Sequence, residues 1–209
     1  MRPEPLDNTK VHSLIYKTHY QVYKKVLAES DMLSEKGETL GAKHRSALHL
    51  RSETKRPTLK KIINSFDSND SGLAWELAIT KIGQSAGGEV IHYGGTNPYD
   101  IDINKSKVEC KIRRTRHQNK TSINNLHPDK FDLMVALIAE EEDKSLDWKV
   151  LVLSSKQILE MEFLIDDLSH GSDGKQFHLT KDRLQDFRNK GVLMSLNEFA
   201  EFASIRFGA

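Results

Sequence analysis

The 209-residue sequence has a single cysteine, Cys110, and no apolar stretch near the roughly 18 residues that a membrane-spanning helix needs. One cysteine excludes an internal disulfide framework and a zinc site built from several thiolates. The sequence also lacks a secretory leader, so we expect a cytoplasmic protein with no membrane partner. Neither a nucleotide phosphate-loop pattern nor a dinucleotide-binding pattern surrounds Gly94-Gly95, which we therefore interpret as a turn.

Charged residues are plentiful but unevenly spread. They make up 29% of the chain and apolar residues 37%, which suits a globular protein of one sizeable domain, with or without a smaller appendage. The net charge is only +1, yet residues 1–61 carry 13 Lys and Arg against 7 Asp and Glu. A basic first third beside an acidic remainder indicates a polyanionic partner such as nucleic acid.

The N-terminal third is predicted to be helical. The spacing of its apolar residues predicts one helix over about residues 9–33, a second over 42–52 and a third that begins at Pro57. The alternative to a DNA-binding role is a helical appendage with a solvated basic face. The side chains that are candidates to contact DNA phosphates are Lys43, Arg45, Arg51, Lys55, Arg56, Lys60 and Lys61.

The polar run from Asp67 to Ser71 is the clearest boundary in the chain. Residues 1–66 would form a basic helical segment for DNA contact or dimerisation, and residues 67–209 a core with C-terminal helices. The patterns in that core predict an α/β fold, a mixed sheet flanked by helices. Its expected elements are a helix over 72–86, strands over 89–93, 131–138 and 149–153, a helix from Ser154 or Ser155 to about Leu168, and helices that begin at Thr180 and Ser195.

The helix expected over residues 72–86 is strongly apolar, with Asp70 or Ser71 as its cap and Gly87-Gly88 as its stop. Glu76 is the only acid within it. A carboxylate on a mostly buried helix needs a partner, because burying an unpaired charge is costly. The alternative is a glutamate at the rim of the helix that reaches water.

Residues 98–112 carry the sequence pattern on which the functional prediction depends most. Two short alternating runs flank a small polar turn, which is typical of a β-hairpin. Successive side chains of a strand point to opposite faces, so each strand has one apolar and one charged face. The charged positions are Asp100, Asp102, Glu109 and Lys111.

The turn decides which charged residues face one another. A two-residue turn at Lys105-Ser106 sets Asp102 opposite Glu109, and a four-residue turn sets Asp100 opposite Glu109. Both registers place three carboxylates and one ammonium on one face, whereas a three-residue turn would mix the faces. Carboxylates across a hairpin repel unless a cation lies among them, and Mg²⁺ takes oxygen ligands. The hairpin is a candidate metal site; the alternative is the solvated face of an edge hairpin.

An aspartate followed, on the next strand, by Glu109-Cys110-Lys111 resembles the motif of the PD-(D/E)xK nuclease superfamily, the fold of many restriction endonucleases. The resemblance spans about residues 70–155, and Pro98 stands two residues before Asp100 instead of beside it. It implies that Asp100 and Glu109 hold Mg²⁺ with the backbone carbonyl of Cys110. Lys111 would orient or deprotonate the attacking water. The implied second-rank ligands, able to recruit a second ion or hold a metal-bound water, are Glu76 and Asp102.

A basic, hydrogen-bond-rich run follows Lys111 directly, where a substrate phosphate would lie. We predict that it binds DNA, through cations on the backbone and amides that can read adenine. The alternative is a basic surface loop without a ligand. The cations are Arg113, Arg114, Arg116 and Lys120, and the amides are Gln118 and Asn119.

These expectations combine into a magnesium-dependent endonuclease for double-stranded DNA, specifically a type II restriction enzyme. Cleavage of both strands of a palindromic site calls for two active sites, so a homodimer is expected. One alternative is a repair or branched-DNA nuclease with the same catalytic residues. Another is a non-catalytic DNA-binding module, because a fold alone does not decide between functions.

Overall fold

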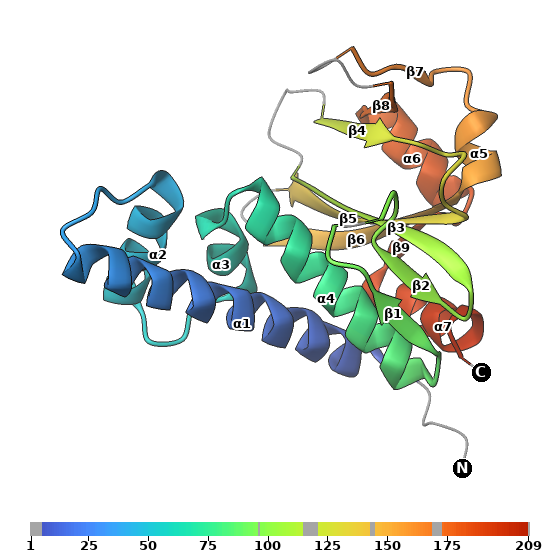
Figure 1. The fold of residues 1–209 in the computed structure, drawn as a ribbon. Helices are drawn as coiled ribbons and strands as arrows, with labels where there is room; N and C mark the ends of the chain where they lie inside the picture. The colour runs from blue at the N-terminus through green and yellow to red at the C-terminus, as the bar shows by residue number, and fades with distance from the viewer. Residues whose placement is uncertain (1–5, 96, 115–120, 143–144, 169–172, 209) are drawn as a thin grey trace.

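The computed structural model describes residues 6–95, 97–114, 121–142, 145–168 and 173–208 (Figure 1). Helices and strands alternate only in part, because the helices gather at the two ends of the chain and the strands in its middle. The helices are α1 (Asn8–Glu35), α2 (Ala42–Glu53), α3 (Leu59–Ser65), α4 (Ser68–Ala86), α5 (Ser155–Leu159), α6 (Lys181–Asn189) and α7 (Leu196–Arg206). The strands are β1 (Val90–His92), β2 (Ile101–Ile103), β3 (Ser106–Arg114), β4 (Thr121–Leu126), β5 (Leu133–Glu142), β6 (Ser145–Ser154), β7 (Ile165–Asp166), β8 (Lys175–Leu179) and β9 (Leu193–Ser195).

The strands form a large sheet and a small one. The large sheet has the order β1-β2-β3-β5-β6-β9, and the small sheet has the order β4-β8-β7. In the large sheet β3 and β5 are parallel, and the other neighbours are antiparallel. The fold is therefore mixed α/β, as the sequence predicts.

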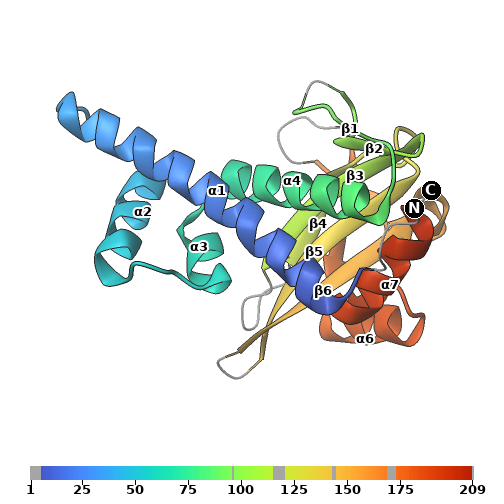
Figure 2. The same cartoon turned by 90° about the horizontal axis from the view of Figure 1, so that it is seen from below.

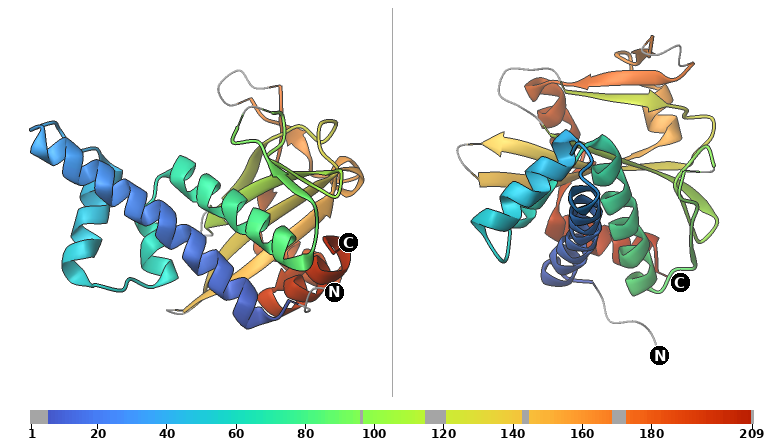
Figure 3. Two further views of the ribbon diagram at one scale, coloured as in Figure 1. Left: turned by 60° about the horizontal axis from the view of Figure 1, so that its bottom comes forward. Right: turned by 60° about the vertical axis from the view of Figure 1, so that its left-hand side comes forward.

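Figure 3 shows the large sheet as a central layer, with α1, α4 and α7 on one face and the small sheet on the other. Side chains alternate along β5: Val135 and Leu137 pack against the helices, whereas Met134 and Ala136 pack toward the small sheet. A strand that is covered on both faces has apolar residues at nearly every position. This explains the almost continuous apolar run of β5. The indole of Trp75 joins the layers by donating a hydrogen bond to the carbonyl of Val135 (3.0 Å).

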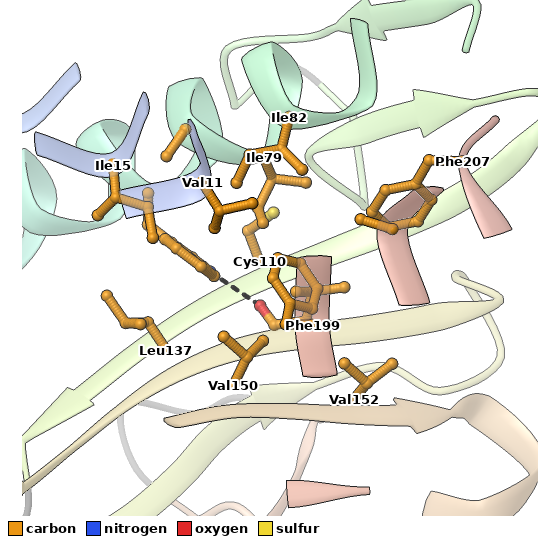
Figure 4. Packing of buried hydrophobic residues seen from close by; sticks show 14 of the residues in the cluster. Val11, Ile15, Ile79, Ile82, Cys110, Leu137, Val150, Val152, Phe199 and Phe207 are labelled. Carbon is orange, nitrogen blue, oxygen red and sulfur yellow. Dashed lines mark hydrogen bonds between the residues drawn. The ribbon is translucent and has the colours of Figure 1, made fainter. Parts of the chain in front are cut away.

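The helix side of the sheet holds the main core, where residues far apart in the chain converge (Figure 4). Val11 and Ile15 of α1 pack there with Ile79 and Ile82 of α4. A second cluster joins the far half of α1 to α2 and α3, and Figure 2 shows these helices extending beyond the sheet. Among the described residues, no helix is both long enough and apolar enough to cross a membrane.

Several predicted end signals are confirmed. Gly87 adopts the left-handed conformation (φ 96°) that ends α4. Thr180 caps α6, and Ser195 with Glu198 forms the capping box of α7. Ser154, one of the two serines proposed as a cap, is the N-cap of α5.

Other boundaries differ from the prediction. The cap of α4 is Asp67, whose side chain accepts a hydrogen bond from the Asp70 amide (2.8 Å), so the polar run forms the first turn of the helix. Thr58, not Pro57, precedes the first residue of α3 and caps it. The prediction of a helix to Leu168 is wrong, because α5 ends at Leu159. Strands β4, β7, β8 and β9 were not predicted.

Candidate active site

The hairpin of β2 and β3 closes on a two-residue turn, Asn104-Lys105, whose φ angles are both positive (50° and 67°). Mirror-image turns of this kind match the twist of the strands. The turn lies one residue earlier than the predicted Lys105-Ser106, because the Asn104 side chain is anchored on both sides. Its amide donates to the Phe207 carbonyl (3.1 Å), and its oxygen accepts from the Glu89 amide (2.9 Å).

The register of the hairpin follows from this turn. Asp102 pairs with Lys107 and Ile101 with Val108, so the next step sets Asp100 across from Glu109. We predicted this pairing for a four-residue turn, but the turn here has only two residues. Ile101 and Val108 are buried against α4, which leaves the charged positions on the opposite face, as predicted.

Asp100 lies at the point where β2 begins, and its carboxylate is partly buried. Its Oδ2 accepts a hydrogen bond from the Cys110 amide (2.7 Å), which fixes the side chain against β3. Burial, followed by repulsion from Glu109 and from Glu76, raises the pKa of Asp100 to about 7, despite the Cys110 hydrogen bond and Lys111. Asp100 is therefore a carboxyl group that lacks enough positive charge around it.

Glu109 and Lys111 share one face of β3 and form an ion pair, with Nζ 2.5 Å from Oε1. Glu109 is only 8% exposed, and its charge is tolerated because the ammonium is adjacent. Asp100, Glu109 and Lys111, the three residues of the motif, are thus brought together.

Glu76 projects from α4, and its Oε2 lies 3.0 Å from Nε2 of His92 on β1. Both side chains are mostly buried, with 17% and 21% of their surfaces exposed. Glu76 therefore has the partner that a carboxylate on an apolar helix needs. His92 was missed in the sequence, although its alternation with Ile91 placed it on the strand face that turns toward α4.

The Asp102 side chain forms a hydrogen bond with a residue outside the Asp100, Glu109 and Lys111 group. Its Oδ2 accepts a hydrogen bond from the Tyr93 hydroxyl (2.6 Å), and this bond raises the pKa of Tyr93. The other oxygen, Oδ1, is buried without a hydrogen-bond partner in the described part of the chain. The Tyr93 contact ranks Asp102 below Asp100 as a metal ligand.

A cleft of about 560 Å³ reaches Glu76, Asp100 and Lys111, whereas Glu109, His92 and Asp102 lie behind its lining. The first turns of α4 form one wall, and the hairpin with the loop before it forms the other. Polar, charged and apolar residues share the lining, which consists of Ser68, Asn69, Gly72, Leu73, Glu76, Gly94, Gly95, Asp100, Cys110, Lys111, Ile112, Arg113 and Asn125.

The chemistry of these donors fits a magnesium ion only if the substrate completes its shell. No group of three His, Cys, Asp or Glu side chains arranged to hold a metal occurs within the described ranges. Mg²⁺, however, is commonly held by one or two carboxylates together with water and phosphate oxygens. Asp100 and Glu109 supply such a pair, and their mutual repulsion is what a divalent cation relieves.

Arg113 is the one member of the predicted DNA-binding run after Lys111 whose side chain is described. Its guanidinium donates to the carbonyls of Ser122 and Ile112 (2.7 Å each) and to the side-chain oxygen of Asn124. Arg113 therefore braces β3 against β4 while it lines the cleft, and burial lowers its pKa. Lying outside the described residues are Arg116, Gln118, Asn119, Lys120 and the side chain of Arg114.

The basic residues of the N-terminal helices are partly neutralised by acids. The Lys43 ammonium lies 3.3 Å from the Asp70 carboxylate, and Arg51 forms a bidentate ion pair with Asp31. Lys61 pairs with Glu53 (3.1 Å). These ion pairs weaken the basic face that the charge distribution predicts.

No family model, curated protein or solved structure matches this chain. The functional conclusion therefore depends on the residues of the cleft and on their geometry.

Proposed function

We propose that this protein is a magnesium-dependent endonuclease that hydrolyses phosphodiester bonds in double-stranded DNA, as a type II restriction enzyme with a restriction-endonuclease-like core. The observation that supports this most is the arrangement of Asp100, Glu109 and Lys111. The hairpin register sets the two carboxylates across from each other, and Lys111, whose ammonium lies 2.5 Å from Glu109, lines an open cleft together with Asp100.

Each residue has a role that its surroundings support. Asp100 and Glu109 would hold the ion, and the chemistry it would supply is polarisation of the phosphoryl oxygen and stabilisation of the leaving oxygen. Lys111 orients a water molecule and offsets the negative charge that develops on the phosphate. We assign Lys111 this electrostatic role because its ammonium is paired with a carboxylate.

The substrate and the assembly belong to the same proposal. An open cleft with amide and hydroxyl groups along α4, from Ser68 and Asn69, suits a sugar-phosphate backbone. Two copies of the chain related by a two-fold axis would present two such clefts to a palindromic site.

The direct test is incubation of plasmid DNA with the purified protein, in magnesium and in EDTA. Discrete fragments that require magnesium support restriction, whereas random degradation supports a general nuclease. Asp100→Asn and Lys111→Met should abolish cleavage. Lys107→Met is the matched control, since Lys107 lies on the same hairpin with its ammonium over the Tyr99 ring.

Two outcomes would overturn the proposal. If a folded Lys111→Met variant cuts DNA at the wild-type rate, the motif is not required for cleavage. DNA binding that is equal in magnesium and EDTA, with all strands intact, would indicate a binding module instead.

A further inference from the structure

The pair of Glu76 and His92 lies beside the motif and is built by two elements that the motif does not include. β1 pairs with β2 so that His92 stands opposite Ile101, on the face of the sheet that packs against α4. Glu76 comes from α4 itself, next to the fully buried Trp75. The contact of 3.0 Å between His92 and Glu76 thus joins the edge strand to the helix.

The two oxygens of Glu76 have different surroundings. Oε2 is taken by Nε2 of His92. Oε1 lies beside Gly72, where an added Cβ would stand 3.9 Å away, and both residues line the cleft. The histidine therefore fixes one oxygen and leaves the other available to the cleft.

Glu76 would not keep this position unaided. Its charge repels Asp100, which also lies in the cleft wall. A glutamate has three side-chain torsions, so a repelled carboxylate that lacks a donor would rotate away. The imidazole N–H supplies the donor that opposes this rotation.

We propose that His92 is a positioning residue that holds Glu76 so that its free carboxylate oxygen stays in the cleft that Asp100 also lines and accepts a hydrogen bond from a water molecule there. This inference rests on the proposed nuclease function, for which His92 itself touches neither substrate nor metal. Removing a group that orients a residue of a metal site commonly costs about 10–100-fold in activity or metal affinity.

The test compares His92→Phe, which removes the donor, with His92→Gln, whose amide can donate from a similar position. His92→Phe should lower kcat for plasmid cleavage about 10–100-fold and leave KM within about threefold. His92→Gln should recover most of that loss. The matched control is His49→Phe, which breaks an exposed pair with Glu53 (3.2 Å) on α2 and should leave kcat unchanged.

A double-mutant comparison separates positioning from a general structural effect. In a Glu76→Ala background, His92→Phe should cause no further loss of kcat, because the histidine acts only through the glutamate. Equal losses in both backgrounds would overturn the inference and leave the nuclease proposal intact. So would a folded His92→Phe variant with wild-type kcat.

A second readout does not depend on cleavage. In NMR spectra, the hydrogen-bonded Nε2–H proton of His92 should be protected from exchange in the wild type and lost in Glu76→Ala. An unprotected proton in the wild type would overturn the pair itself. If the wild type cleaves no DNA, the proposed function fails and the catalytic purpose of the pair fails with it, while this spectrum still decides whether the pair forms.

Discussion

The ammonium of Lys111 lies 2.5 Å from the carboxylate of Glu109, and the two residues alternate with Cys110 along one strand. Neither side chain is freely exposed, so each depends on the other to remain charged in place. Under the proposed function, one substitution at this pair should therefore change both stability and cleavage, and a second substitution can separate the two effects.

Lys111→Met should lower the cleavage rate at least 100-fold, because the charge that offsets the developing phosphate charge is removed. It should also lower the free energy of unfolding by about 1–3 kcal/mol, since Glu109 loses its partner. The double variant Lys111→Met/Glu109→Gln should regain stability without regaining activity. Urea denaturation and plasmid cleavage measure the two effects, and a double variant less stable than the single one would contradict the coupling.

Asp100 should make the metal-free protein less stable as the pH rises. Its pKa is about 7 in the folded protein against 3.8 for an ordinary aspartate, so the folded state binds more protons between these values. Stability then falls from about pH 4 to pH 7. Asp100→Asn should flatten that fall and, in EDTA at pH 8, be more stable by on the order of 4 kcal/mol. Parallel stability curves for the two proteins would refute this.

Magnesium should stabilise the wild-type protein without DNA. An ion held between Asp100 and Glu109 at 100 times its Kd adds about 2.7 kcal/mol to the free energy of unfolding. For a chain of this size the melting temperature should rise by roughly 5–10 °C. The shift should vanish in Asp100→Asn. A similar shift in that variant would place the ion elsewhere.

Asp102 should matter for stability more than for cleavage. Tyr93→Phe removes the hydrogen bond to Asp102 and should cost about 1–3 kcal/mol, because the carboxylate already has one buried oxygen without a partner. Asp102→Asn should keep cleavage within about tenfold of the wild type, whereas Asp100→Asn should abolish it. The reverse ranking in a cleavage assay would make Asp102 the primary ligand.

Gly88→Ala should destabilise the fold by about 1–3 kcal/mol, because the new Cβ would overlap the backbone carbonyl oxygen of Phe207. Gly72→Ala is the matched control. An added Cβ there meets only an ordinary contact inside α4, and the loss of a helical glycine should stabilise by about 0.5–1 kcal/mol. Thermal melting measures both, and equal effects would contradict the steric argument.

The helices were the most predictable part of the fold. Side chains that cap their own helix give local signals, such as Ser195 with Glu198, and these need no tertiary information. The small sheet was not predictable in the same way. In β4 only Ile123 and Leu126 are buried, and the polar remainder resembles a loop until Ser122 is seen beside His178 on β8 (2.7 Å).

Within the candidate site, alternation was sufficient to place Glu109 and Lys111 on one face. The register was not predictable, because it depends on Asn104 being held by Phe207, 103 residues away. The sequence also hides the partner of Glu76, since His92 meets it only through the packing of β1 on α4. Features set by residues close together in the sequence can be predicted from it. Contacts between residues that only the folded chain brings together cannot.

The length of the Asn104-Lys105 turn is constrained, because it decides which face of the sheet each side chain of β3 occupies. Deleting or adding one residue there would exchange the two faces of β3, turning Glu109 toward the helix side of the sheet and Cys110 away from it. Replacing Lys105 by Asn or Gly should have a small effect by comparison, since its side chain is exposed and both residues tolerate its positive φ of 67°. Homologues should therefore vary in composition at this turn while its length stays constant, a pattern opposite to that of most surface loops.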